Sequence, residues 1–110
     1  MKVITSPVKR FSGTVTLSDP LTFPQVIALQ AAFDATQALE KPTPASVNYA
    51  LLPGVLGCVE AWGLSGFPQV VTAETFPATP PVSSGRLIAW LVEEVSKLYQ
   101  EADDPAPLAV

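Results

Sequence analysis

One segment, from Val82 to Ala102, constrains the fold more than any other, because its apolar residues recur at helical spacing. The residues that share this apolar face are Leu87, Ile88, Leu91, Val92, Val95, Leu98 and Tyr99. Trp90 falls outside the stripe, among charged positions that include Arg86 and Glu94. The sequence therefore predicts a long amphipathic helix that buries one face and leaves Trp90 on the other.

The start of the chain predicts extended structure. Residues 8–17 read VKRFSGTVTL, in which apolar and polar side chains alternate with the period of a strand. The preceding KVIT, residues 2–5, is a candidate second strand after the turn Ser6-Pro7. Because a two-stranded hairpin alone is marginal in water, this arm, about residues 1–18, should pack on helices or pair with another chain.

Two further helices are predicted between the arm and the last helix. Thr22 and Gln25 fit a capping box that opens the first, which should run to about Glu40. Apart from a narrow apolar stripe that includes Phe33, this helix consists largely of alanines. It should therefore have a weak core face and a smooth back that allows close approach of another backbone.

The second helix should begin at Thr43-Pro44 and run through roughly Trp62 to a cap at Gly63. Pro53 lies within it, and a proline clashes with the carbonyl four residues earlier. A kink or a break into two short helices is therefore expected near Leu52 to Gly54.

Residues 64–81 are rich in turn residues but too apolar for a solvated tether, so they predict an ordered loop with one helical turn capped by Thr72.

The expected fold class is mainly α, a small domain of three to four helices with an N-terminal β-strand or β-hairpin arm. One helical domain should span residues 1–102. Residues 103–110 should form a flexible acidic tail that contains proline.

Composition excludes several classes of function. The 110 residues include 6 basic and 10 acidic side chains, for a net charge of −4, which disfavours nucleic acid as a partner. The longest apolar stretch, Tyr49 to Val59, is too short to cross a bilayer and contains proline and glycine, so no membrane association is expected. No signal peptide is evident at the start.

Catalytic chemistry is not expected. The chain has no histidine, which removes the usual general base and zinc ligand. Cys58 lies in an apolar segment without a basic neighbour and predicts an inert core thiol, and Asp103-Asp104 offers too few oxygens for calcium. We therefore expect no catalytic residues, no metal and no cofactor, although a deep pocket at Cys58 or Glu60 would favour an enzyme.

Binding through surface side chains is the remaining possibility. Trp90 could stack on Arg86 one turn earlier and contact a partner, or it could pack beneath the loop of residues 64–81. The other candidate contact residues are Phe33, Phe67 and Phe76. The sequence leaves both alternatives for Trp90 open.

Two segments, ALLPGVLGCVEAWGLSGFP (residues 50–68) and VTAETFPATPPVSSGRLIAWLVEEVSKLY (residues 71–99), resemble the small tail assembly chaperones of long-tailed bacteriophages. The lead-in FSGTVTLSDPLTFPQV (residues 11–26) is also similar in type, so the resemblance covers most of the chain. It rests on the order of elements and on residues such as Trp62 and Glu74.

The resemblance implies a non-enzymatic protein that binds the apolar, helical tape-measure protein in the host cytoplasm while the tail assembles, and that is absent from the mature virion. Such proteins tend to oligomerise, for which the N-terminal arm is the candidate contact. The main alternative is a small structural virion protein, a head-tail or tail-tube adaptor, in which the arm would complete a neighbour's sheet.

Overall fold

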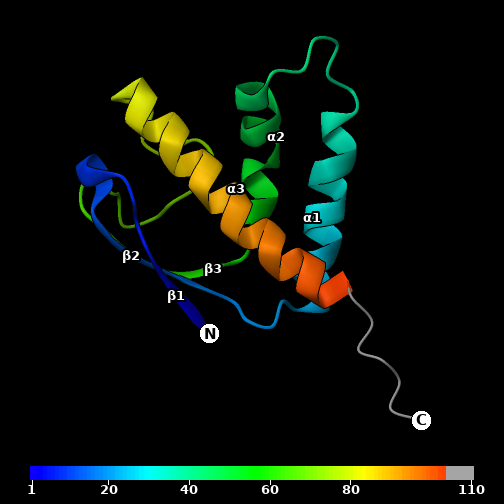
Figure 1. Cartoon of the computed structure of the whole chain (residues 1–110), viewed down its shortest axis with the longest axis horizontal. Helices are drawn as coiled ribbons and strands as arrows, with labels where there is room; N and C mark the ends of the chain where they lie inside the picture. The colour runs from blue at the N-terminus through cyan, green and yellow to red at the C-terminus, as the bar shows by residue number, and fades with distance from the viewer. Residues whose placement is uncertain (104–110) are drawn as a thin grey trace.

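A computed structural model describes residues 1–103, and Figure 1 shows how their elements are arranged. The elements follow one another as β1 (Lys2–Thr5), the 3-10 turn η1 (Lys9–Phe11), β2 (Gly13–Leu17), α1 (Phe23–Thr36), α2 (Pro44–Leu56), β3 (Val59–Leu64) and α3 (Pro81–Asp103). The acidic tail expected over residues 103–110 lies, from residue 104 onward, outside this description. None of the helices within residues 1–103 combines the length and apolar character needed to cross a membrane.

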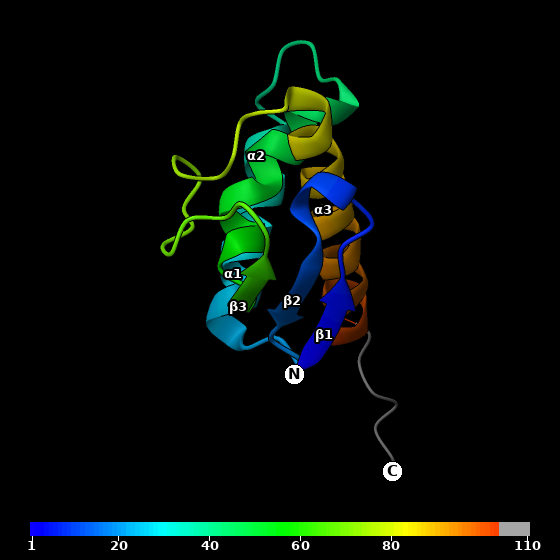
Figure 2. The same ribbon diagram turned by 90° about the vertical axis from the view of Figure 1, so that its left-hand side faces the viewer.

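The three strands form one antiparallel sheet in the order β1-β2-β3, so β2 is the central strand. Ile4 lies opposite Val15, and Val15 lies opposite Trp62, which places these three side chains on one face. That face is buried, whereas Val3 on the other face is 63% exposed. The helices lie on one side of the sheet (Figure 2), so the sheet has one covered and one open face.

The expected fold class was wrong: residues 1–103 form an α+β fold, with three α-helices and a three-stranded sheet in this part of the chain, rather than a mainly α one. The difference lies in residues 59–64, which form β3 and not the end of the second helix. β2 offers backbone groups on both sides, and β3 pairs with the side that β1 leaves free. The arm therefore finds its third strand within the same chain.

A pair of glycines allows β2 and β3 to approach. Gly13 has a φ of 131°, a conformation that favours glycine, and a side chain there would collide with the carbonyl oxygen of Gly63. The Ser65 amide then donates to the Ser12 carbonyl at 2.9 Å, beyond the paired strands. These contacts draw the segment after β3 back beside the start of β2.

Both predicted helix starts are confirmed. At Thr22 and at Thr43 the threonine hydroxyl accepts from the amide three residues later, and the side chain of Gln25 or Ser46 bonds back to the cap amide. α1 ends at Thr36, earlier than the expected Glu40. A kink or a break was expected near Pro53; α2 runs as one helix through it, so the break into two short helices is not found.

The last helix is confirmed almost to its predicted ends. Its predicted apolar face supplies the most deeply buried residues of the helix, Leu87, Leu91, Val95 and Leu98, each no more than 2% exposed. α2 packs against both α1 and α3 and thus joins the helical pair to the long helix (Figure 1).

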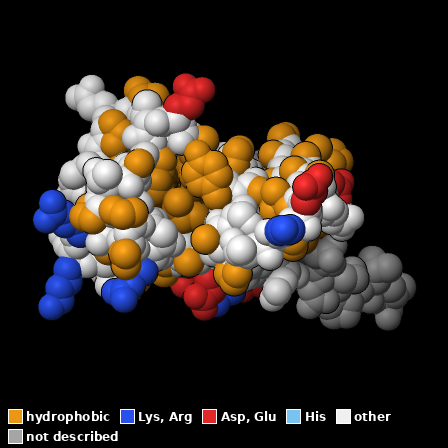
Figure 3. All heavy atoms as spheres, turned by 90° about the horizontal axis from the view of Figure 1, so that it is seen from above, with side chains coloured by type: hydrophobic (Ala, Val, Ile, Leu, Met, Phe, Trp, Pro, Cys, Tyr) orange, Lys and Arg blue, Asp and Glu red, His pale blue; other side chains and the backbone are white. Residues whose placement is uncertain are grey.

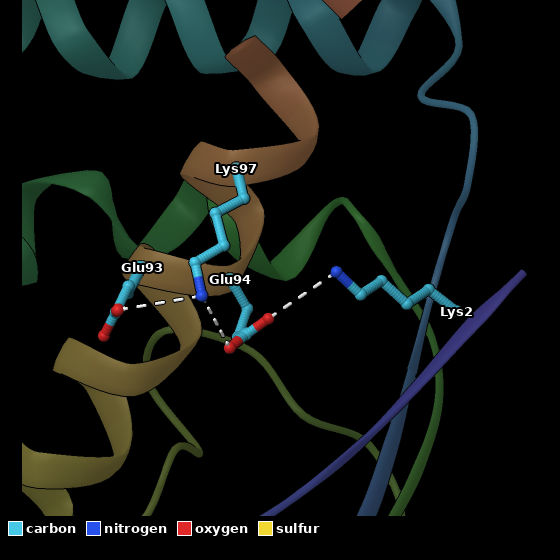
Figure 4. Close-up of polar contacts among 4 residues, drawn as sticks. All are labelled: Lys2, Glu93, Glu94 and Lys97. Carbon is cyan, nitrogen blue, oxygen red and sulfur yellow. Dashed lines mark hydrogen bonds and ion pairs between the residues drawn. The ribbon is translucent and has the colours of Figure 1, made fainter. Parts of the chain in front are cut away.

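Glu94 on α3 connects the long helix to the first strand. Its carboxylate lies 3.8 Å from the Lys2 ammonium and 3.5 Å from that of Lys97, and Lys97 also lies 3.8 Å from Glu93 (Figure 4). An attraction between the basic start of the chain and the acidic last helix is thus made within one molecule.

Candidate functional site

The loop between β3 and α3 is held by four aromatic side chains, Phe11, Trp62, Phe67 and Phe76. The rings of Trp62 and Phe67 stack with centroids 5.1 Å apart, and Phe67 also makes edge contacts with Phe11 at 5.5 Å and Phe76 at 5.3 Å. Phe76 is only 7% exposed. Of the candidate contact residues, Phe76 is therefore buried and Phe67 is half-buried against the other rings.

The predicted turn in this loop is present. The Thr72 hydroxyl accepts from the Thr75 amide at 3.2 Å, and the Phe76 amide donates to the Thr72 carbonyl at 2.8 Å. The turn directs Phe76 towards the aromatic cluster, so the loop is ordered through local bonds and ring packing together.

The other candidate residues lie apart from this cluster. Phe33 is half-buried on α1 and makes an edge contact with Tyr99, with centroids 5.2 Å apart. Trp90 is half-buried and packs against the core, and Arg86 one turn earlier is exposed. The structure does not gather Phe33, Phe67, Phe76, Trp90 and Arg86 into one surface.

A second region, which sequence reasoning did not select, is the hairpin face, the open groove of about 380 Å³ between α1 and α2. It is lined by small apolar residues: Ala28, Ala31, Ala32, Ala35, Ala50, Pro53 and Gly54. α2 contains no charged residue and α1 contains only Asp34. The alanine-rich back of α1 is evident in the sequence, but only the packing of α1 against α2 shows that α2 continues the same apolar surface.

Gly54 sets how closely the two helices approach at this groove. A Cβ at this position would lie 3.1 Å from the Ala32 Cβ and 3.2 Å from the Ala28 carbonyl oxygen. Two large side chains, Phe23 at 76% and Ile27 at 47% exposed, precede the groove on α1. These two residues are four positions apart, and Ala31 of the groove lining follows after four more. Phe23 and Ile27 therefore extend the apolar surface of the groove along α1.

A third region is a cavity of about 370 Å³ between the first turns of α2 and α3 and the loop segment 73–78. Its lining is mainly apolar and includes Tyr49, Phe76, Pro77 and Ile88, with polar contributions from Asn48, Glu74 and Ser84. Seen from the side that carries the starts of α2 and α3, hydrophobic side chains gather around a hollow (Figure 3).

The titratable residues do not form a reactive arrangement in the part of the chain that the structure describes. Cys58 is fully buried, its thiol lies 3.5 Å from the Gly54 carbonyl oxygen, and burial raises the pKa of the thiol from 9.0 to about 11. Its thiolate, the nucleophilic form, is therefore scarce at neutral pH. Glu60 is exposed on β3, and residues 1–103 hold no group of three or more potential metal ligands.

Comparison with known proteins adds no relative: no family model, no curated protein and no solved structure matches this chain.

Proposed function

We propose that this protein is a non-enzymatic bacteriophage tail assembly chaperone that binds apolar helical segments of the tape-measure protein through the hairpin face. The observation that carries the proposal is the composition of that face. Two packed helices with a single charged residue between them expose Phe23 and Ile27 beside a groove lined by alanine, glycine and proline.

The shape of the groove favours a helix as the occupant. Small side chains let another helix lie close, and a groove between two helices accepts an amphipathic helix by its apolar face. Full burial of a side chain such as Phe or Ile contributes about 1.5–3 kcal/mol. Phe23 and Ile27 are already partly covered, so each gains less than full burial on binding, and several weak contacts along a long helical partner suit this face better than one tight interface.

The remaining candidate residues have different places in this proposal. Phe67 and Phe76 support the loop, and Phe33 supports the contact between α1 and α3. Trp90, half-buried beside the exposed Arg86, remains a candidate contact at a second point of the surface. Such a protein would act in the host cytoplasm and leave the tail before the virion matures.

Co-expression with a tape-measure fragment tests the proposal. The Ile27→Asp variant places a charge beside the groove and should reduce co-purification at least tenfold, while its melting temperature stays close to that of the wild type. Val82→Asp, at a 69% exposed position on α3, is the matched control and should bind normally. Equal binding by wild type and Ile27→Asp would exclude the hairpin face.

The free edge of the sheet at β1 favours one alternative, a small structural virion protein that acts by oligomerisation. β1 is an outer strand, and Met1 and Val3 are 82% and 63% exposed. A strand from a neighbouring subunit could extend the sheet at this edge. Mass spectrometry of purified particles separates the two functions: stoichiometric amounts of this chain in mature virions would refute the chaperone proposal.

A further inference from the structure

The cavity between α2, α3 and residues 73–78 contains two adjacent residues that the fold itself does not explain. Gly85 lies inside α3, where glycine costs about 1 kcal/mol relative to alanine. A Cβ at this position would meet no atom within 4 Å. Unlike Gly13 or Gly54, Gly85 is therefore not required by any neighbour in the part of the chain that is described.

Ser84, the residue before it, carries a buried hydroxyl without a partner. Its side chain is 5% exposed, and Oγ makes no hydrogen bond within residues 1–103. A buried hydroxyl without a partner is destabilising by about 1–3 kcal/mol. Ser84 lines the cavity, but its Oγ is buried in this structure, so the hydroxyl would have to rotate about χ1 to another staggered position to meet a polar group placed there.

The chemistry of the walls defines the occupant. The lining is mostly apolar, and its volume of about 370 Å³ is near the lower end of small-ligand sites, roughly 300–1,000 Å³. One aromatic ring suits this space. Glu74 is the one charged residue of the lining and makes no ion pair with the described residues, so a basic group beside the ring would complement it.

We propose that this cavity binds a tyrosine or tryptophan side chain, flanked by a lysine or arginine, from the protein's polypeptide partner. The ring lies over Gly85, where the absent side chain leaves room, and its O–H or N–H group bonds with the Ser84 hydroxyl. The basic neighbour lies near Glu74. The identity of the partner rests on the proposed function, but the chemistry of the site does not.

Three capped dipeptides test the site by titration against the amide NMR signals of the whole protein. Acetyl-Lys-Tyr-amide should shift the signals of residues 84, 85 and 88 saturably. Acetyl-Lys-Phe-amide, which lacks the hydroxyl, should bind about fivefold more weakly, the effect of one hydrogen bond. Acetyl-Glu-Tyr-amide should also bind more weakly, and 1 M NaCl should remove its difference from the lysine peptide.

Matched variants separate binding from folding. Gly85→Leu should weaken binding of acetyl-Lys-Tyr-amide at least tenfold, whereas Ala89→Leu, one turn further along α3 and outside the lining, should leave it unchanged. Gly85→Ala should raise the melting temperature and yet weaken binding, a combination that a purely structural role does not produce. Ser84→Ala should abolish the preference for Tyr over Phe.

The site is refuted if acetyl-Lys-Tyr-amide gives no saturable shifts, or if Gly85→Leu and Ala89→Leu bind it equally. Dipeptide binding without any co-purification of a tape-measure fragment would retain the site and reject the proposed function. Co-purification without dipeptide binding would retain the function and reject the site.

Discussion

The long helix α3 and the helical pair α1–α2 use apolar residues in different ways. On α3 the apolar face is buried, with Leu87 and Leu91 at 0% exposed, and the opposite face carries charges such as Glu93 and Lys97. On α1 and α2 apolar residues occupy the inner and the outer sides, and the outer side remains open as the hairpin face. On α3 the predicted apolar face is used by the core, with Val82 in the first turn as an exposed exception, whereas the apolar content of the helical pair exceeds what the core uses.

The largest expected effect comes from the core of α3. Leu91→Ala removes a side chain with no solvent exposure and should lower the free energy of unfolding by about 3 kcal/mol, because it leaves a cavity. Urea denaturation measures this change. Ile27→Ala on the hairpin face should cost less than about 0.5 kcal/mol. Similar losses for the two variants would contradict the distinction between the two regions.

A smaller effect is expected where α1 and α2 touch. Gly54→Val should cost about 2 kcal/mol, because the added atoms press on the Ala28 carbonyl and the Leu29 backbone, which cannot move aside. The same substitution at Gly85, where an added Cβ meets no atom within 4 Å, should change the stability little. Thermal denaturation of the two variants provides the test, and an equal loss at both positions would refute the close approach at Gly54.

The pH dependence of stability tests whether the core around Cys58 excludes water. Burial raises the pKa of its thiol from 9.0 to about 11, so the folded state holds the proton more tightly than the unfolded state. The resulting stability is fully present below pH 9 and is lost as the pH rises towards 11. The difference in unfolding free energy between wild type and Cys58→Ala should therefore shift against the wild type over this range. A pH-independent difference would indicate an accessible thiol.

The smallest effect concerns the charged side of α3. Glu94→Gln removes the contacts to Lys2 and Lys97 and should cost about 0.5 kcal/mol at low salt. Glu93→Gln, at a more exposed position with Lys97 as its partner, should cost less. Melting temperatures at 20 mM and 1 M NaCl provide the comparison, because salt should remove the difference. A loss that persists at high salt would assign Glu94 a packing role.

Local signals predicted the helices well but did not point to the hairpin face. Thr22, Thr43 and the periodicity of residues 82–102 specify helix starts and a buried face within a few turns of chain, and the structure has them at those places. Trp90 and Phe76 were selected as large aromatic residues, but their exposure depends on distant neighbours. The hairpin face consists of residues too small to attract notice singly.

The sequence by itself determined where the helices begin, which face of α3 is buried, and that the N-terminal arm contains extended strands, because capping bonds and side-chain periodicity act over short distances. The predicted strand over residues 8–17 is present only as β2, Gly13–Leu17, since Lys9–Phe11 form a 3-10 turn, and the partner of the arm was left open. Only the tertiary structure decided that residues 59–64 form a strand. In isolation they extend the apolar pattern of α2, and their extended conformation is stabilised by pairing with β2, which lies more than 40 residues earlier in the chain. The same long-range packing leaves the hairpin face open and creates the cavity around Gly85.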